Sequence, residues 1–417
     1  MDNYELGIRN DELKEPQIRF KGFSDEWEEK TLCNLATMHA RIGWQNLRTS
    51  EFLDDGDYYL ITGTDFINGQ VDFENCHYID EDRYKQDPKI QLDNDSILIT
   101  KDGTLGKVAL VRNLDKPATL NAGVFNVKVI QNRADVLFLF QYLKAPYLMN
   151  YVNSKATGGT IKHLNQNILV DFPIIHPNEI SEQTAIGSFF KTLDSRIEAQ
   201  GKKIEKLSAM KKALLAKMFP SSNNYELGIT NYELNKPQIR FKGFSDAWEE
   251  KTIADLCSIS TGKSNTQDKV DEGNYDFYVR SPIIEKSDKY LYDEEAVLTV
   301  GDGVGTGKVF HYVNGKYDLH QRVYRMFDFN ENMSAKFFYR IFSKDFNNRV
   351  MAMTAKTSVD SVRYEMIADM KLKFPTLPEQ TAIGSFFKKV DELIALSNKE
   401  LEQLKNIKSA LLEKMFV

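Results

Sequence analysis

The sequence predicts an α+β protein in which two pseudo-symmetric α/β domains are joined by two long helices that form an antiparallel coiled coil. Three observations predict this fold. The ten residues that begin at Glu182 return unchanged at Glu379, a segment of 30 residues near the start returns in the middle of the chain, and each copy of the ten residues opens a heptad pattern. Repetition on this scale indicates a duplicated architecture.

Two nearly identical lead segments, residues 3–32 and 224–253, precede the two domains. They match at 24 of 30 positions, and both contain Pro-Gln-Ile-Arg-Phe-Lys-Gly-Phe-Ser-Asp-x-Trp-Glu-Glu-Lys-Thr. The chain therefore consists of a lead segment, an insert and a long helix, followed by the same three parts again. We predict a first domain over residues 1–178, a spacer helix over 179–219, a second domain over 220–376 and a second spacer helix over 377–417.

The two inserts run from about Cys33 to Ile175 and from about Ala254 to Thr376, and their sequences differ. Short runs rich in β-branched and aromatic residues alternate with Gly, Asp and Asn turns in both. Each insert therefore predicts an α/β domain with a mixed, mostly antiparallel sheet. We expect strands at Tyr58–Thr62, Ser96–Thr100, Val108–Val111, Phe277–Val279, Ala296–Val300 and Lys308–Phe310, and helices at Val136–Asn153 and Ala335–Met353.

Both long segments carry an apolar repeat of 3.5 residues. Alternating steps of four and three residues lead from Ile186 to Met218 and from Ile383 to Met415. Such a repeat is typical of helices that supercoil with a partner, and about 40 residues rise ~60 Å, more than a small domain covers. The simplest partner of each helix is the other one. The residues that we assign to this spacer are Gln183, Ile186, Phe190, Leu193, Ile197, Gln200, Gln380, Ile383, Phe387, Val390, Ile394 and Ser397.

Polar residues interrupt the apolar repeat at equivalent places in the two helices. Gln200 and Ser397 form one such pair, and Lys211 and Lys408 form the other. A polar residue on a coiled-coil seam costs stability but fixes the register and the partner. We therefore expect these positions to define how the helices pair.

Length and composition place the chain among globular proteins of several domains. Its 417 residues are 42% hydrophobic and 27% charged, and this length exceeds what one core supports. The longest apolar run, Val136–Tyr142, is too short to span a bilayer, and the first residues lack the pattern of a signal peptide. Three scattered cysteines, Cys33, Cys76 and Cys257, fit a reducing compartment and have no partners at metal-ligand spacing. We expect a cytoplasmic protein without a membrane segment.

The glycine-rich loops do not match a nucleotide-binding site. Gly301–Lys308 resembles a phosphate-binding loop, but Asp302 stands where glycine is required and Val309 where serine or threonine is required. A tight turn between two strands explains these glycines and those of the equivalent loop, Lys101–Lys107. Six histidines form no convergent set, and neither a nucleophile elbow nor a zinc-protease motif occurs. We expect no catalytic centre, no metal and no cofactor in this chain.

Charge is distributed unevenly within each insert. Glu51–Asp95 hold 13 acidic and 3 basic residues, whereas Ser96–Phe172 hold 4 and 9. In the second insert Asp268–Asp302 hold 10 acidic and 4 basic residues, and Gly303–Lys373 hold 7 and 12. The functional interpretation is that the basic half faces nucleic-acid phosphates, while the acidic half faces away or meets a partner protein. Random clustering is the plain alternative, and the net charge of −6 argues mildly against nucleic acid.

Loops of the two basic halves supply the candidate DNA contacts. Small hydroxyl residues beside a lysine suit close approach to phosphate, and Lys, Arg, Asn and Gln can read base edges. For any single residue, a solvated polar loop is the alternative. The candidates are Lys101, Thr104, Lys107, Thr157, Thr160, Lys162 and His163 in the first insert, and Lys308, Arg322, Lys356, Thr357, Ser358 and Arg363 in the second.

The orientation of the long helices follows from this interpretation. Two domains that read one duplex equivalently are related by a two-fold axis perpendicular to the DNA, as in dimeric repressors. Two helices that lie along the duplex and obey that axis are antiparallel, whereas a parallel pair would place both domains at one end.

The repeated motifs resemble those of the specificity subunits of type I restriction-modification systems. The resemblance rests on Glu-Gln-x-Ala-Ile-x-x-Phe-Phe at the start of each long helix and on Pro-x-Ile-Arg-Phe-x-Gly-Phe-x-x-x-Trp in each lead segment. The first insert adds Asp-Gly-Thr-x-Gly-Lys and Gly-Gly-Thr-Ile-Lys-His-Leu, and the second departs, with Thr-Ala-Lys-Thr-Ser in place of Gly-Gly-Thr-Ile-Lys. The resemblance covers essentially the whole chain.

This resemblance implies a non-catalytic subunit with two target-recognition domains. Each domain would read half of a bipartite double-stranded DNA sequence, and the paired helices would set the unread gap. Two methyltransferase subunits, which hold S-adenosylmethionine and methylate adenine, would dock on the spacer residues and the rest of the duplicated frame. Translocating restriction subunits would join them, with ATP and magnesium on these partners.

Two other functions stay open at this point. A coiled-coil adaptor that binds only proteins would show no affinity for DNA. A fused restriction or methylation enzyme would need catalytic motifs, and those motifs are missing.

Overall fold

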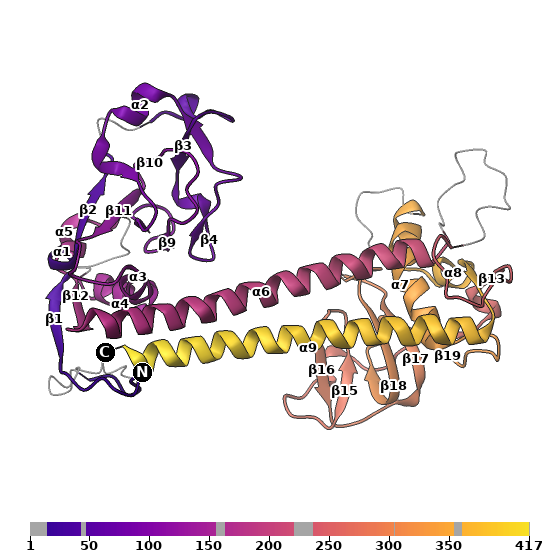
Figure 1. Cartoon of the computed structure of the whole chain (residues 1–417). Helices are drawn as coiled ribbons and strands as arrows, with labels where there is room; N and C mark the ends of the chain where they lie inside the picture. Colours follow the sequence, from indigo (N-terminus) through magenta and orange to yellow (C-terminus); the bar gives the residue numbers. More distant parts are fainter. Residues whose placement is uncertain are drawn as a thin grey trace. The chain divides into compact units, whose positions relative to one another are not determined.

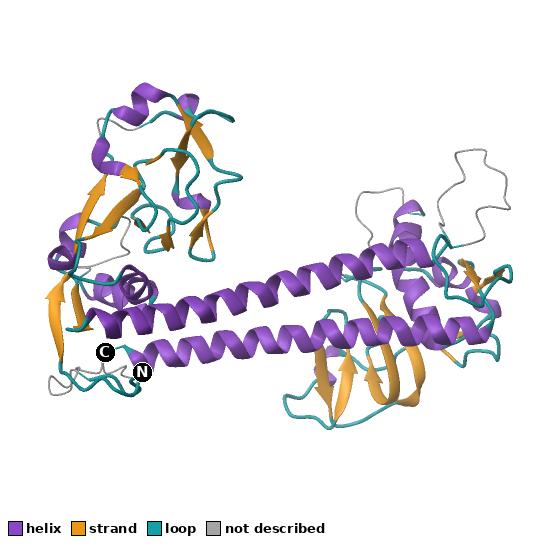
Figure 2. Cartoon of the chain, in the orientation of Figure 1, coloured by secondary structure: helices purple, strands orange, loops and turns teal. Residues whose placement is uncertain are grey.

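The computed structural model describes residues 15–42, 47–155, 163–220, 237–303, 305–353 and 361–416. The chain divides into two compact units, of which unit 1 comprises Met1–Gly201 and Glu400–Val417 and unit 2 comprises Lys202–Lys399 (Figure 1). Both contain helices and sheets (Figure 2). Because the boundaries fall inside the long helices, each helix begins in one unit and ends in the other.

Unit 1 contains short strands in two main sheets. Their orders are β6-β3-β10-β7 and β2-β11-β8-β9-β5-β4, and β1 pairs separately with β12. The strands are β1 (Trp27–Thr31), β2 (Ala36–Ala40), β3 (Tyr58–Ile61), β4 (Phe66–Ile67), β5 (Gln70–Val71), β6 (His77–Ile79), β7 (Gln91–Leu92), β8 (Ile97–Thr100), β9 (Val108–Leu110), β10 (Ala118–Leu120), β11 (Val124–Val129) and β12 (Pro173–Pro177). The helices are α1 (Leu32–Leu35), α2 (Glu81–Lys85), α3 (Val136–Lys144), α4 (Pro146–Ser154), α5 (Gln166–Val170) and the start of α6 (Ile180–Met218).

Unit 2 contains one six-stranded sheet of order β14-β19-β17-β18-β15-β16 and the separate pair β13-β20. The strands are β13 (Glu249–Thr252), β14 (Ser258–Thr261), β15 (Tyr275–Tyr278), β16 (Ile284–Ser287), β17 (Tyr292–Val300), β18 (Phe310–Leu319), β19 (Val323–Phe327) and β20 (Lys371–Phe374). The helices are α7 (Ala335–Ala352), α8 (Tyr364–Ala368) and the start of α9 (Leu377–Met415).

The predicted sheet character is confirmed, with two corrections to the predicted elements. Among the named strands only the pairs β3/β10, β5/β9 and β15/β18 are parallel. The helix predicted over Val136–Asn153 is two helices, since Pro146 forces an extended conformation on Ala145 (φ −69°, ψ 162°). The strand predicted at Lys308–Phe310 begins only at Phe310, because the amides of Lys308 and Val309 still bond the Gly305 carbonyl in the glycine turn.

Within each unit the two long helices run antiparallel, as predicted. In unit 1, Gln200 bonds Glu400 at 2.7 Å, while Asp194, six residues earlier, pairs with Lys408, eight residues later, at 2.5 Å. In unit 2, Lys211 pairs with Asp391 at 2.6 Å. Directly after the end of α6, the Phe219 ring contacts Phe387, which precedes Asp391 in α9. As the residue number rises in α6, the number of its partner in α9 falls, which defines an antiparallel arrangement.

The lysines that interrupt the heptad repeat form equivalent ion pairs. Lys408 pairs with Asp194 and Lys211 with Asp391, and each aspartate also binds a helix of the insert in its own unit. Asp194 accepts from Gln141 of α3 at 2.8 Å, and Asp391 pairs with Arg340 of α7 at 2.6 Å. Each seam lysine, through its aspartate, therefore ties both long helices to an insert helix, and leaving such a lysine unpaired would be costly.

The end of each long helix lies in the core of the unit in which it ends. Phe416 packs against Phe138, Tyr142 and Phe190 of unit 1, with ring centroids 5.4–5.6 Å apart. Phe219 packs in the same way against Trp248, Phe337 and Phe387 of unit 2. Both phenylalanines are 2% exposed.

A bidentate ion pair clasps each lead segment to the start of a long helix. The Arg19 guanidinium binds both carboxylate oxygens of Glu182 at 2.7 and 2.8 Å, and Arg240 binds Glu379 at 2.7 Å twice. The neighbouring isoleucine amide donates to the end of the other long helix, from Ile18 to the Lys414 carbonyl at 3.0 Å in unit 1. Each lead segment thus holds the start of one helix and the end of the other.

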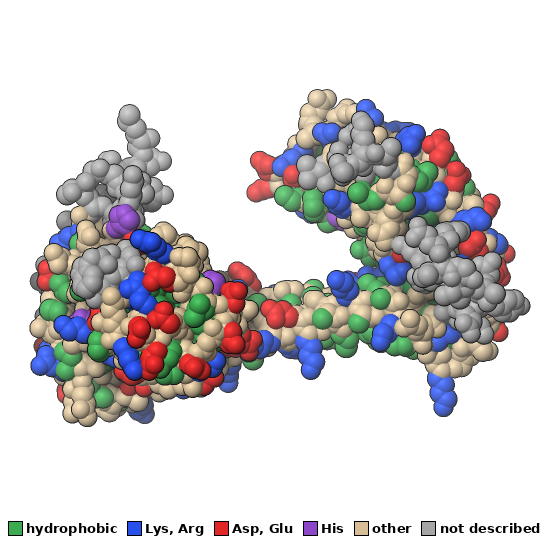
Figure 3. Space-filling model, turned by 90° about the horizontal axis from the view of Figure 1, so that it is seen from above, with side chains coloured by type: hydrophobic (Ala, Val, Ile, Leu, Met, Phe, Trp, Pro, Cys, Tyr) green, Lys and Arg blue, Asp and Glu red, His purple; other side chains and the backbone are tan. Residues whose placement is uncertain are grey.

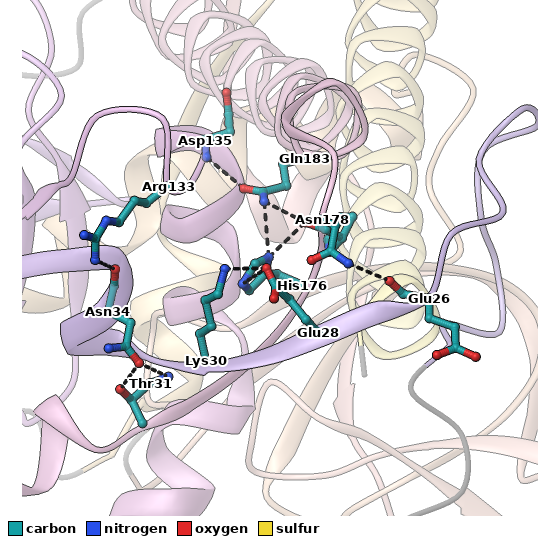
Figure 4. A network of polar contacts seen from close by, with 11 residues as sticks. Glu26, Glu28, Lys30, Thr31, Asn34, Arg133, Asp135, His176, Asn178 and Gln183 are labelled. Atoms are coloured by element: carbon teal, nitrogen blue, oxygen red, sulfur yellow. Dashed lines mark hydrogen bonds and ion pairs between the residues drawn. The ribbon is translucent and has the colours of Figure 1, made fainter.

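The glutamine after each buried glutamate joins the helix to the insert. Gln183 donates to the Pro177 carbonyl at 2.8 Å. It also accepts from the Asp135 amide at 2.8 Å, as Figure 4 shows. Gln380 makes the same two bonds in unit 2, to the Pro375 carbonyl and from the Ser334 amide. Four residues on, a Cβ on Gly187 would lie 2.6 Å from the Phe138 amide, so only glycine permits this contact between α6 and α3.

We predict that Phe416→Ala destabilises unit 1 by about 3–5 kcal/mol, because it removes a buried aromatic ring from the core. Phe219→Ala should do the same to unit 2. Amide hydrogen exchange, followed peptide by peptide, measures each unit separately. Each variant is the control for the other, and the exposed Glu413→Ala is a second control. Equal loss of protection in both units from either single variant would contradict this assignment.

We predict that His176→Phe lessens the acid sensitivity of unit 1. Burial lowers the pKa of His176 from its ordinary value of 6.5, so the unfolded chain binds the proton more readily. Protonation of His176 therefore favours the unfolded chain. Unit 1 keeps its full stability above pH 6.5, where this histidine is neutral in both states, and loses stability as the pH falls below that value. Phe374 stands at the matching position of the β13-β20 ladder, so phenylalanine suits the site.

Urea unfolding of unit 1 at pH 7.5 and pH 5, followed by hydrogen exchange, measures this effect. The half-buried His39→Gln is the control. An unchanged loss of stability between the two pH values in His176→Phe would contradict the prediction.

Candidate nucleic-acid interface

Four loops meet at the same edge of the fold in both units. They follow β3, β8 and β10 and precede α5 in unit 1, and they follow β15, β17 and β18 and precede α8 in unit 2. Parallel pairing of β3 with β10 and of β15 with β18 places the ends of these strands at one edge. We call this the loop edge; it comprises residues 62–65, 101–107, 121–123 and 163–165 in unit 1 and 279–282, 301–303, 305–308, 320–322 and 361–363 in unit 2.

Equivalent backbone hydrogen bonds hold the two loop edges. In unit 1 the Lys101 amide donates to the Gly123 carbonyl and the Lys101 carbonyl accepts from Leu164, both at 2.9 Å. In unit 2 the Gly301 amide donates to the Arg322 carbonyl at 2.8 Å and the Gly301 carbonyl accepts from Val362 at 2.7 Å. The same scaffold therefore presents different side chains in the two units.

The glycine turn of unit 1 is fixed from inside by Thr100. Its hydroxyl donates to the Thr104 carbonyl at 2.5 Å and accepts from the Lys107 amide at 2.9 Å. Gly103 and Gly106 both have φ of +70°, which only glycine adopts readily. Next to this turn, His163 Nδ1 lies 2.5 Å from Asp102 Oδ1. The turn is thus a rigid platform with exposed polar groups.

The loop edge of unit 2 contains a polar cavity of about 440 Å³. Two arginines, three amide side chains, a threonine and a histidine line it, and none of these residues is acidic. At its edge Asp302 lies 3.5 Å from Arg280 Nη1 and 3.7 Å from Arg322 Nε. The lining residues are Asn265, Thr266, Gln267, Arg280, His320, Gln321 and Arg322.

Hydrogen bonds fix the wall of this cavity. The Arg322 amide donates to His320 Nδ1 at 3.0 Å, so Nε2 carries the ring proton and lies 3.4 Å from the Thr266 hydroxyl. Burial, followed by the charge of Arg280, lowers the pKa of His320 and favours this neutral form. Gln321 donates to Asn265, and its own amide donates to the Ser264 carbonyl at 2.8 Å.

The structure brings many of the predicted DNA contacts together. Lys101, Thr104, Lys107 and His163 share the loop edge of unit 1, and Lys308, Arg322 and Arg363 share that of unit 2. Arg322 lines the cavity, and Arg363 is the N-cap residue of α8. The other candidates, Thr157, Thr160, Lys162, Lys356, Thr357 and Ser358, lie outside the described residues.

Among the residues that line the cavity, sequence reasoning singled out only Arg322. Four of the residues that it missed, Asn265, Thr266, Gln267 and Arg280, precede or belong to the acidic half of the second insert, which was expected to face away from DNA. The other two, His320 and Gln321, directly precede Arg322. The run His320-Gln321-Arg322, directly after a strand, was the available signal.

The division into an acidic and a basic half does not produce two separate faces. In unit 1, strands of the basic half pair with strands of the acidic half, and Lys128 of the basic half pairs with Asp93 of the acidic half at 2.5 Å. In unit 2, strands of the two halves interleave in one sheet. Figure 3 accordingly shows acidic and basic side chains intermixed on the visible face of each unit. The expectation that the acidic halves face away as blocks is therefore wrong.

The predicted spacer residues lie mainly on the buried side of the long helices. Gln183 and Gln380 are fully buried, and so are the first three apolar seam residues of each helix. Ile197, Gln200 and Ile394 are half-buried, and Ser397 is 2% exposed. The buried seam residues are Ile186, Phe190, Leu193, Ile383, Phe387 and Val390.

Comparison with known proteins identifies the family. The family model described as "Type I restriction modification DNA specificity domain" matches residues 24–209 and 245–406, one match for each insert and the first part of its long helix. The chain belongs to this family.

The relatives within this specificity family span most of the chain. The type I restriction enzyme MjaVIII specificity subunit of Methanocaldococcus jannaschii is 22% identical over 343 residues, which is 77% of each chain. The putative MjaX specificity subunit of the same organism is 22% identical over 419 residues, covering 93% of this chain and 92% of that one. A crystal structure of a type I restriction-modification S subunit from M. genitalium has a TM-score of 0.66 at 18% identity and covers 97% of this chain and 99% of its own. The fold with two target-recognition domains and two long helices is thus that of the family.

The described residues contain neither a membrane-spanning helix nor a cluster of metal ligands. No helix among them is both long and apolar enough to cross a membrane. No group of three or more His, Cys, Asp or Glu side chains among them could hold a metal ion.

Proposed function

We propose that this chain selects the DNA target of a type I restriction-modification complex. The loop edge of each unit reads one half of a bipartite sequence, and the paired helices set the number of base pairs between the halves. Methyltransferase and restriction subunits dock on the duplicated frame in the cytoplasm, and they supply S-adenosylmethionine, ATP and magnesium. This chain is non-catalytic.

One observation carries this proposal. The two units share the clasp, the glutamine bonds and the backbone of the loop edge, yet the side chains at that edge differ. Asp102 faces His163 in unit 1, whereas the equivalent Asp302 faces two arginines beside a cavity in unit 2. A constant scaffold with different polar groups suits two readers of two different base sequences.

The helices suit the role of a spacer because both of their ends are anchored. Their seam is buried in apolar and ion-pair contacts within each unit, which fixes the register of α6 against α9. If the register of the two helices is fixed, the length of the helices determines how many base pairs separate the two half-sequences.

We predict that methylated adenines, mapped in cells that carry this chain with its own methyltransferase subunits, occur in one bipartite motif. Two specified sequences should flank a constant number of unspecified base pairs. The same cells without this chain are the control and should lack the motif. An uninterrupted motif, or methylation that does not depend on this chain, would contradict the proposal, and a protein-only adaptor would give no motif.

We predict that deletion of residues 202–208 together with the equivalent residues 399–405 keeps both half-sequences and shortens the gap. Seven residues rise ~10 Å in a helix, which corresponds to about three base pairs at 3.4 Å each. The deletion removes one heptad from each helix and with it Glu400, the partner of Gln200. The clasps, the two terminal phenylalanines and both seam ion pairs, Lys408–Asp194 and Lys211–Asp391, stay in place if the seam re-forms. Methylation mapping of this variant measures the gap, and an unchanged gap would refute the spacer role. A deletion of 202–208 alone is the control and should abolish methylation, because it puts the two helices out of register.

A further inference from the structure

The aspartate of the glycine turn occupies an unexpected position for a DNA-reading surface. Asp102 and Asp302 follow β8 and β17 at equivalent places, as the matching bonds of Lys101 and Gly301 show. A carboxylate near phosphates is repelled unless cations neutralise it. In unit 1 Asp102 lies 2.5 Å from His163, and in unit 2 Asp302 lies beside the guanidinium groups of Arg280 and Arg322. The aspartate that both units share therefore acts on the side chains beside it, His163 in unit 1 and the two arginines in unit 2.

From this geometry we infer that Asp302 is a positioning residue that orients Arg280 and Arg322 to read a guanine in the half-site of unit 2. The inference rests on the proposed function. The edge of that base pair then occupies the cavity of about 440 Å³ beside Asp302. Asp102 has the same positioning role for His163 in unit 1.

The backbone holds Asp302 firmly enough for this role. The preceding residue, Gly301, bonds Arg322 and Val362, and Asp302 itself bridges to Ser361. A Cβ on Gly301 would lie 2.7 Å from the Arg322 carbonyl oxygen, so this close approach requires glycine. Gly303, at φ +81°, completes the turn. The backbone that carries the Asp302 carboxylate is thus held in one position.

The two arginines keep donors available for DNA. Asp302 contacts one nitrogen of each guanidinium, and each guanidinium carries five N–H donors. The side chain of Arg280 is 49% exposed and that of Arg322 is 65% exposed. An exposed arginine without a partner samples many rotamers, whereas a carboxylate on one nitrogen restricts them and leaves the other edge for a ligand.

The chemistry of the cavity favours a purine edge. Arginine donates two parallel hydrogen bonds to O6 and N7 of guanine, the pairing that best matches its planar fork. The neutral His320 and the linked pair Gln321–Asn265 form a fixed polar wall behind the arginines. The carboxylates whose charges act on His320 are Asp302 and Asp268, and Asp268 is paired with Lys289 at 3.0 Å. Donors therefore dominate the opening, which suits a base that presents two acceptors.

The test measures discrimination at each position of the target, once methylation mapping has identified it. The full chain with its methyltransferase subunits is bound to double-stranded DNA libraries in which one half-site at a time is randomised. Asp302→Asn should lower the preference for guanine at one position of the second half-site by about tenfold or more, and leave the first half-site unchanged. Non-specific affinity should not fall, because the substitution removes a negative charge.

Matched variants separate positioning from folding. Asp276→Asn removes another ion-paired surface carboxylate of unit 2, bonded to Lys286 at 2.8 Å, and should change nothing. Asp302→Glu keeps the charge and should restore part of the discrimination. Arg280→Ala or Arg322→Ala should reduce preference at the same position, and adding Asp302→Asn to that variant should cost little more, since the residues act together. Asp102→Asn should affect the first half-site alone.

Three outcomes would overturn this inference. Unchanged discrimination in Asp302→Asn excludes the positioning role, and equal losses in both half-sites or a parallel loss of non-specific affinity indicates a folding defect instead. A second half-site without guanine excludes the guanine reading. These results differ from failure of the proposed function, in which the unaltered complex would show no sequence preference at all.

Discussion

The fold depends on one buried ion pair in each unit, formed by Arg19 with Glu182 and by Arg240 with Glu379. The two glutamates are 1% and 0% exposed, and removal of one partner from such a pair typically costs about 3–5 kcal/mol. The pair joins the segment that leads into an insert to the helix that leaves it. Because both ends of the insert are held in this way, the residues between them can differ without loss of the frame.

The frame was largely predictable from the sequence, because its signals are local and periodic. The heptad repeat predicted the buried positions of Ile186, Phe190 and their counterparts, and symmetry predicted the antiparallel pairing. The position of Phe416 was not predictable in the same way. Its contacts with Phe138 and Tyr142 join residues more than 270 apart, and a heptad pattern assigns such a residue to a seam and not to the core of a distant domain.

The sequence predicted the glycine turns of the loop edge but not the residues that strand pairing brings beside them. Glycine turns are visible in sequence, so Lys101, Thr104 and Lys107 were found. Arg280 was missed because charge was counted along the chain, whereas the parallel pairing of β15 with β18 places Arg280 beside residues 320–322. Pairing between strands distant in sequence decides which polar groups meet, and composition carries no information about it.

The exchange of helix ends has a consequence for folding during synthesis. The core of unit 1 is completed by residues 400–416, so almost the whole chain must leave the ribosome before that core can close. Unit 2 receives Met218 and Phe219 from a helix that is already made, and it can close as soon as the start of α9 emerges. The domain that is translated first is thus the last to be finished, and until then its aromatic cluster stays open to solvent and to chaperones.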